Sequence, residues 1–250
     1  MNRILIKPSD ICSTSVVDWT SLGANFHLQD SYRLEHLRTI MRLNHGDTVR
    51  VCLVDWGNGI CQVKSIEEDC ISLELIKSEK GLNSPVGLVL GLCRPPSLRK
   101  VIEHTTGMGV THFYVVCCEL SEKSYLHSKW FRAEKLNELF SLGLAQDHSH
   151  SRLPQLQLFN NFFQFLESAS ELRETFTSKM ILDQNSDKWI ESDAESPCFA
   201  IGPERGFTST EIEKLINLGF VSKKVSQSVL RVEHACFHGL AQWEYCRRLK

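Results

Sequence analysis

Two short segments near the end of the chain carry the residues best suited to binding and chemistry. The first, 201–207 (IGPERGF), follows an apolar run that reads as a buried strand and precedes a helix with Thr208 or Ser209 as N-cap. A Gly-Pro-x-x-Gly turn after a parallel strand lets backbone N–H and C=O groups approach a ligand closely. It is not a GxGxxG loop and has no Walker lysine, so no dinucleotide or nucleoside triphosphate is implied. Taken alone, it could equally be a tight structural turn.

The second segment, 225–245 (VSQSVLRVEHACFHGLAQWEY), comes one predicted helix and one predicted strand later. Because the ends of parallel strands share one edge of a sheet, this spacing predicts that the two segments lie side by side. Together they could form one pocket.

The elements that position these segments alternate between strand and helix from residue 84 onward. The strands are predicted from continuous apolar runs, and the helices from apolar positions spaced by three and four. This alternation predicts a parallel sheet with helices on both faces. The predicted strands are 86–92, 110–117, 179–183, 198–201 and 220–225, and the predicted helices are 98–109, 130–144, 160–172, 210–218 and 232–248.

The first 78 residues read differently, as short strands with one amphipathic helix. The helix is indicated by Leu34, Leu37, Ile40 and Met41. Four strands in so short a span favour a small barrel, with the glycines of 56–59 (WGNG) in a hairpin turn. The strands are predicted at 3–7, 47–55, 60–66 and 70–77, and a turn-rich linker at 78–85 divides domains at 1–78 and 84–250.

Composition narrows the class of protein. The chain has 250 residues, which at ~150 residues per domain predicts two unequal domains, with one large domain as the alternative. Its 42% hydrophobic and 23% charged residues are ordinary for a globular protein, which excludes a disordered or fibrous chain. The formal net charge is −2, so any partner must be bound through local patches rather than through an overall field.

The ten cysteines predict reduced core thiols and a cytoplasmic protein. They form no CxxC pair and lie mostly in apolar runs, and the chain shows neither a signal-peptide h-region nor ~20 apolar residues for a membrane span. Cys117 and Cys118 end a buried strand without an evident base, which argues against a nucleophile. His148 and His150, and the cluster at 234–238, lack a second ligand group, so we expect no metal.

The two C-terminal segments also resemble a known family. IGPERGF followed by VLRVEHAC (229–236) is similar to the paired signatures of the bacterial ribosomal RNA small-subunit methyltransferase E (RsmE) family, of the SPOUT class. Three further stretches are similar to that family in order and spacing. They are HLRTIMRLNHGDTVRV (36–51), SLRKVIEHTTGMGVTHFYVV (97–116) and SEKSYL (121–126).

The resemblance implies a fold, a cofactor and a reaction. The fold would be a PUA-like RNA-binding β-barrel followed by an α/β domain with a deep trefoil knot, in a homodimer. The activity would be methylation by S-adenosylmethionine of N3 of a uridine in 16S ribosomal RNA of the small subunit. Carried over by position, the cofactor-binding residues would be Ile201, Gly202, Pro203, Glu204, Gly206, Val225, Ser226, Val229, Leu230 and Arg231.

Within this reading two residues are expected to act in catalysis. A cation near the uracil oxygens would favour the deprotonated base, and Arg231 at the start of the last helix is the best candidate. Glu233 could orient Arg231 or accept the N3 proton, whereas a carboxylate that only stabilises the helix N-terminus is the alternative. The expected RNA-binding residues are Arg38, Arg42, Arg99 and Arg205. The alternative interpretation is that each of them is an ordinary solvated side chain.

Departures from the family pattern leave other functions open. Ser226, Ser228 and His234 replace a glycine, an arginine and a threonine of the family signature. One alternative is a SPOUT enzyme with another base or a transfer RNA as substrate. The other is a non-catalytic RNA-binding or assembly factor whose site has drifted.

Overall fold

The computed structural model describes residues 3–12, 18–82, 84–191 and 194–249. The chain divides into two compact units, here called the first unit (1–83 and 144–153) and the second unit (84–143 and 154–250). The sequence placed residues 144–153 with the C-terminal domain, but the structure groups this segment with the first unit. The physical reason is hydrogen bonding, because Arg3 N donates to Ala145 O and Leu82 N donates to Ser149 O, at 2.8 and 2.9 Å.

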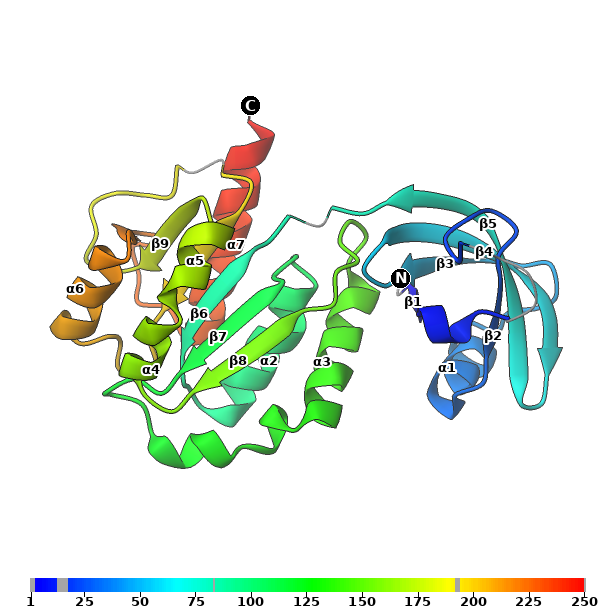
Figure 1. Cartoon of the computed structure of the whole chain (residues 1–250), viewed down its shortest axis with the longest axis horizontal. Helices are drawn as coiled ribbons and strands as arrows, with labels where there is room; N and C mark the ends of the chain where they lie inside the picture. Colours follow the sequence, from blue (N-terminus) through cyan, green and yellow to red (C-terminus); the bar gives the residue numbers. More distant parts are fainter. Residues whose placement is uncertain (1–2, 13–17, 83, 192–193, 250) are drawn as a thin grey trace. The chain divides into compact units, whose positions relative to one another are not determined.

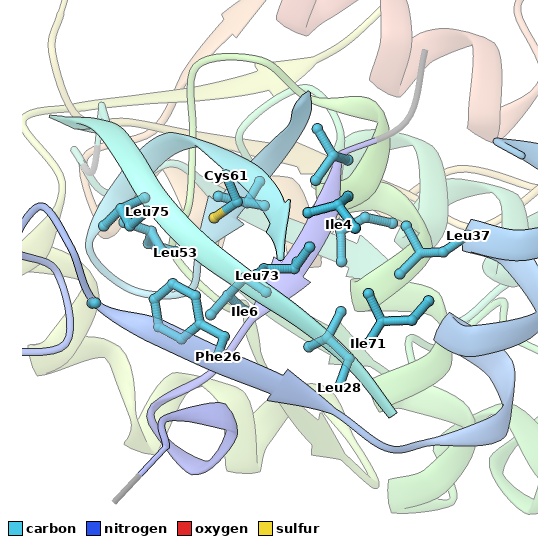
Figure 2. Packing of buried hydrophobic residues seen from close by; sticks show 14 of the residues in the cluster. Ile4, Ile6, Phe26, Leu28, Leu37, Leu53, Cys61, Ile71, Leu73 and Leu75 are labelled. Atoms are coloured by element: carbon cyan, nitrogen blue, oxygen red, sulfur yellow. The ribbon is translucent and has the colours of Figure 1, made fainter. Parts of the chain in front are cut away.

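The first unit is built on a five-stranded sheet with the order β1-β3-β4-β5-β2. β1 pairs parallel with β3, and the other neighbours pair antiparallel. Side chains from all five strands fill its interior, among them Ile6, Phe26 and Leu73, each fully buried (Figure 2). The strands are β1 (Ile4–Ile6), β2 (Asn25–Leu28), β3 (Thr48–Leu53), β4 (Gly57–Glu67) and β5 (Cys70–Lys80).

Two predictions for the first unit need correction. The predicted amphipathic helix is α1 (Ser31–Glu35) followed by one π-helical segment, His36–Ile40. The glycines of 56–59 were expected in a turn, but Gly57 and Gly59 lie inside β4. A side chain at Gly57 would approach Glu79 O within 2.1 Å, so close pairing with β5 requires glycine there.

The second unit contains six strands in the order β11-β9-β10-β6-β7-β8, and every pair of neighbours is parallel. The predicted parallel α/β fold is therefore confirmed. β8 was not predicted because its sequence, QLQLF, alternates polar and apolar residues at the half-buried edge of the sheet. The strands are β6 (Gly87–Gly91), β7 (His112–Val116), β8 (Gln155–Phe159), β9 (Ser178–Leu182), β10 (Pro197–Ile201) and β11 (Val221–Lys223).

Helices cover both faces of this sheet (Figure 1). α4 and α5 pack on one face through Phe165, Leu172 and Phe176, whereas α7 packs on the other face with Trp243 against Phe199 of β10. The helices are α2 (Pro95–Thr106), α3 (Ala133–Gln146), α4 (Phe162–Glu167), α5 (Ala169–Thr175), α6 (Ser209–Asn217) and α7 (Val232–Arg248), with short 3-10 turns η3 (Lys123–His127) and η4 (Lys129–Phe131). Within the described ranges, none of the helices combines the length and apolar character that crossing a membrane requires.

Candidate functional site

The loop after β10 forms a tight turn at the carboxyl edge of the sheet. Gly206 N donates to Pro203 O at 2.8 Å, and Gly206 adopts a φ of +76°, which favours glycine. Gly202 lies against the other end of the turn, since a Cβ there would be 2.7 Å from Phe207 N. Thr208, one of the two predicted N-cap residues, is the N-cap of α6 and forms a capping box with Glu211. Ile201 and Pro203 are buried, whereas Glu204 and Arg205 are exposed.

This loop rests on the connection between β6 and α2. Gly91, the last residue of β6, faces Pro203 so closely that a Cβ would lie 2.3 Å from Pro203 Cδ. Arg94 N donates to Glu204 Oε1 at 2.8 Å. Because Arg94 is the N-cap residue of α2, the Glu204 carboxylate satisfies a free N–H at the positive end of that helix.

The second candidate segment, 225–245, begins with a loop at 225–231 that leads into α7. Val225 is buried, and its carbonyl oxygen accepts a hydrogen bond from Gln242 Nε2 at 2.6 Å. Ser226 Oγ accepts from Ser228 N at 3.0 Å. Val229 is 80% exposed, and Arg231 is exposed at the N-cap of α7. In the described part of the chain no carboxylate pairs with Arg231, so its charge is available to a ligand.

Glu233 lies in the first turn of α7 and is buried. Burial alone would raise the pKa of this carboxyl, but its own backbone N–H and the Ser97 side chain donate hydrogen bonds to it. With the nearby positive charge of Lys100, these contacts hold the pKa below its ordinary value of 4.5. Glu233 is therefore ionised at neutral pH and joins the start of α7 to the start of α2.

The two candidate segments converge on the beginning of α2. Cys93 is buried next to both Glu204 and Glu233, and burial and these two carboxylates raise the pKa of its thiol. Glu204 belongs to the first segment, and Glu233 to the second, 225–245. The two segments meet at the start of α2, although β9 lies between β10 and β11 in the sheet.

A third strand-end loop, after β7, is attached to the same edge. Glu211 is buried, and its two carboxylate oxygens accept from Glu119 N and Thr208 N, both at 2.9 Å. Cys117 and Cys118 are buried at the end of β7, and burial raises the pKa of both thiols. The prediction that both are buried in the core is confirmed.

Sequence reasoning missed the start of α2 as part of this site. Gly91, Arg94, Ser97 and Lys100 provide the contacts that join the two segments. A signal was present, because Gly91 ends an apolar strand and the Pro-Pro pair at 95–96 opens the next helix. That is the same strand-turn-helix pattern that marked residues 201–207.

The expected RNA-binding residues have different surroundings. In the first unit, Arg38 Nη2 donates to the carbonyl oxygens of Glu67 and Glu68, the second at 2.7 Å. Arg38 lines a groove of about 470 Å³ with Glu35, Glu68 and Asp69, which makes this groove acidic overall. Arg42 is exposed and adopts a φ of +51°, in the left-handed region that favours glycine. The surroundings therefore favour Arg42 over Arg38 as a contact for phosphate.

In the second unit, Arg205 is exposed in the loop after β10, next to Glu204. Arg99 lies on α2, where it pairs with Glu103 at 3.0 Å and covers the ring of Trp130. No group of three or more His, Cys, Asp or Glu side chains in the described ranges is arranged to hold a metal ion.

The chain can now be compared with known proteins. Residues 80–244 match the family model of the RNA methyltransferase domain. The chain is 25% identical over 224 residues to ribosomal RNA small subunit methyltransferase E 1 of Borreliella burgdorferi, covering 88% of this chain and 92% of that protein. It is 26% identical over 210 residues to ribosomal RNA small subunit methyltransferase E of Treponema pallidum, covering 81% and 79%.

A solved structure shows the same fold. The crystal structure of a ribosomal RNA small subunit methyltransferase E from Neisseria gonorrhoeae, bound to S-adenosyl methionine, has a TM-score of 0.74 at 16% identity. The similarity covers 98% of this chain and 97% of that one. The parallel sheet with its strand-end loops and the match over most of the chain define an RNA methyltransferase, and the chain belongs to this family. The curated relatives that it resembles over most of its length are named ribosomal RNA small subunit methyltransferase E.

Proposed function

We propose that this protein methylates N3 of a uridine in 16S ribosomal RNA of the small subunit, with S-adenosylmethionine as methyl donor. The relatives' names and the family model support this activity. The structural observation that carries it is the convergence of segments 201–207 and 225–245 on the start of α2, through Glu204 and Glu233.

The residues present fit a bound S-adenosylmethionine. Gly206 faces open space at positive φ, so the backbone of its turn remains accessible to a ligand. Val225 to Leu230 is held by backbone and serine contacts, which leaves Val229 exposed beside the N-terminus of α7. Ile201, Gly202, Pro203, Glu204 and Gly206 of one loop and Val225, Ser226, Val229, Leu230 and Arg231 of the other would hold the cofactor. When bound, S-adenosylmethionine supplies an electrophilic methyl group on its sulfonium.

Arg231 and Glu233 have separate roles in this proposal. The Arg231 guanidinium would lie near the uracil oxygens and favour the anionic base, whose N3 is the stronger nucleophile. Glu233 has a lowered pKa and is held by Ser97, which makes it a weak proton acceptor. It therefore acts as a positioning residue, which holds the first turn of α7 and with it Arg231.

The first unit would bind RNA as a PUA-like domain. Its five-stranded sheet and the exposed Arg42 support this. Arg38 instead donates hydrogen bonds to backbone carbonyl oxygens, so its main role is to stabilise the fold. Arg99 and Arg205 would contact RNA from the second unit, near the start of α2 and in the loop after β10.

The second unit would form a trefoil knot, with the chain after β11 threaded through the connection between β9 and β10. The contacts of α7 with that connection support this topology. Trp243 Nε1 donates to Ala194 O at 2.8 Å, and Cys246 Sγ lies 3.6 Å from Ile190 O.

The exposed Val229 and Tyr245 are apolar surface that a second copy of the chain would cover in a homodimer. All ten cysteines are free thiols, which fits the reducing cytoplasm where ribosomal RNA is modified.

Two measurements test the proposed function. Calorimetry should show binding of S-adenosylmethionine, and small subunits from cells lacking the gene should accept one methyl group, which mass mapping would place on N3 of a uridine. No binding at millimolar cofactor would favour the assembly-factor alternative. Binding without methyl transfer to small subunits would indicate another RNA substrate.

A further inference from the structure

The ring of Trp130, on the surface of the second unit, is in contact with two cations. Arg99 Cζ is 5.7 Å from the centroid of the indole ring, and Lys129 Nζ is 5.1 Å from it. Trp130 belongs to η4 and Arg99 to α2, so the arrangement is created by tertiary packing. The ring is half-buried, and both cations are exposed. We call Trp130, Arg99 and Lys129 the Trp130 platform.

The platform lies close to the candidate site along α2. Arg99 follows Arg94, whose backbone N–H holds Glu204, by five residues. At 1.5 Å per helical residue this is about 7.5 Å along the axis. Stacked nucleotides rise ~3.4 Å each, so the separation corresponds to about two nucleotides.

A second tryptophan–cation pair, Trp243 with Arg247, differs from the Trp130 platform in the exposure of its ring. Arg247 Cζ lies 5.0 Å from the ring of Trp243, but Trp243 is only 3% exposed and its Nε1 donates to Ala194 O. The ring of Trp243 is therefore part of the hydrophobic core and cannot stack with a ligand. Trp130 keeps part of its surface exposed, and the Arg99–Glu103 ion pair holds the guanidinium in place over the ring.

We propose that the Trp130 platform binds single-stranded RNA next to the target uridine. An unpaired base would stack with Trp130, and Arg99 and Lys129 would contact the adjoining phosphates. Aromatic rings flanked by cations suit single strands because every base has a stacking face and every nucleotide a phosphate. This inference rests on the proposed function and adds Lys129 and Trp130, which lie outside the family-like stretches quoted above, to the residues that would set the affinity for RNA.

Trp130→Ala tests the platform in the full-length protein. The probe is a short single-stranded RNA with a central uridine, measured by fluorescence anisotropy, and small subunits serve as methyl acceptor. Because one stacked base contributes ~1–3 kcal/mol, we expect Trp130→Ala to weaken RNA binding about 10-fold or more. KM for the small subunit should rise with little change in kcat, and affinity for S-adenosylmethionine should be unchanged.

Matched variants separate stacking from folding. Trp130→Phe keeps an aromatic face and should retain most of the RNA affinity, whereas Phe163→Ala removes an exposed ring of α4 and should change neither RNA affinity nor KM. Lys129→Ala should lower the slope of log affinity against log salt by about 0.7, as expected for one lost phosphate contact on a single strand. Lys214→Ala, on the exposed face of α6, should leave that slope unchanged.

The result that overturns the platform is wild-type RNA affinity and KM in Trp130→Ala while the wild-type enzyme is active. Absence of methyl transfer by the wild-type protein would overturn the proposed function instead, so the two failures are distinguishable.

Discussion

Each unit of this protein buries a carboxylate whose pKa is lowered, Asp147 in the first unit and Glu233 in the second. Burial would raise the pKa of Asp147, but a hydrogen bond and the charge of His150, with the backbone N–H of Ser149, outweigh it. These partners lie within three residues along the chain. The partners of Glu233 include Ser97 and Lys100 on another helix.

The difference between these two carboxylates indicates different roles. Asp147 holds the shape of a single segment, 144–153, which the buried guanidinium of Arg3 also binds through the carbonyl oxygens of Leu144 and His150. Glu233 joins two helix starts at the edge where the candidate ligand loops meet. A change at Asp147 should therefore affect stability first, and a change near Glu233 should affect the reaction first.

The largest expected effect is that of Arg231→Ala on the second unit. Removing the cation that favours the anionic base should lower kcat for methyl transfer by about 10²–10³-fold. Turnover on small ribosomal subunits under saturating cofactor measures this effect, and Arg231→Lys should recover part of the rate. Wild-type turnover in Arg231→Ala would contradict the assigned role.

Glu233→Gln should have a smaller effect on the same reaction. The amide keeps the size of the side chain but loses the charge that Ser97 and Lys100 hold, so Arg231 is positioned less well. We expect kcat to fall about 10-fold. The acid limb of the pH–rate profile should stay in place, because a positioning residue is not the proton acceptor. Loss of that limb in the variant would identify Glu233 as the base.

Asp147→Asn should instead reduce the stability of the first unit. The carboxylate has a lowered pKa when folded, so it stabilises the fold above its ordinary pKa of 3.8, and this contribution is lost as pH falls through the folded value. Urea unfolding at pH 7 should show a loss of about 1–2 kcal/mol in the free energy of unfolding. The difference from wild type should be constant down to about pH 5 and shrink below it. A difference independent of pH would refute this account.

The smallest expected effect is a gain in stability in Arg42→Gly. Arg42 occupies a left-handed conformation at φ +51°, which costs ~1 kcal/mol for a residue with a side chain. Glycine should recover up to about that amount in the free energy of unfolding. Affinity for RNA should fall at the same time, with a lower salt slope, if the strained arginine contacts phosphate. Unfolding curves and RNA binding on the same preparation measure both effects.

Much of the second unit could be predicted because its strands are continuous apolar runs between helical patterns. α7 was predicted at its observed bounds, and β7 within a residue or two. The predicted helix at 160–172 is instead α4 and α5, divided at Ser168, whose hydroxyl bonds Phe165 O. The first unit was less predictable. β2 was missed because four residues with two exposed positions give a weak signal.

Residues of the candidate site were predictable only where local chemistry revealed them. The Gly-Pro turn at 202–203 and the arginine at 231 carry such signals in the sequence. Ser97 and Lys100 do not, because their contact with Glu233 depends on how α2 meets α7. The same holds for Trp130, which lies 31 residues from Arg99 in the chain and contacts it only through packing.

By itself, the sequence determined the parallel α/β class and the two strand-end loops that are candidates for ligand binding, because these follow from apolar periodicity, turn residues and strand order. The tertiary structure alone decided that 144–153 belongs to the first unit and that the start of α2 completes the site. It also decided which arginines form hydrogen bonds within the protein, as Arg38 does, and which are exposed to solvent, as Arg42 is. Hydrogen bonds between residues distant in sequence set these features, and no local pattern encodes them.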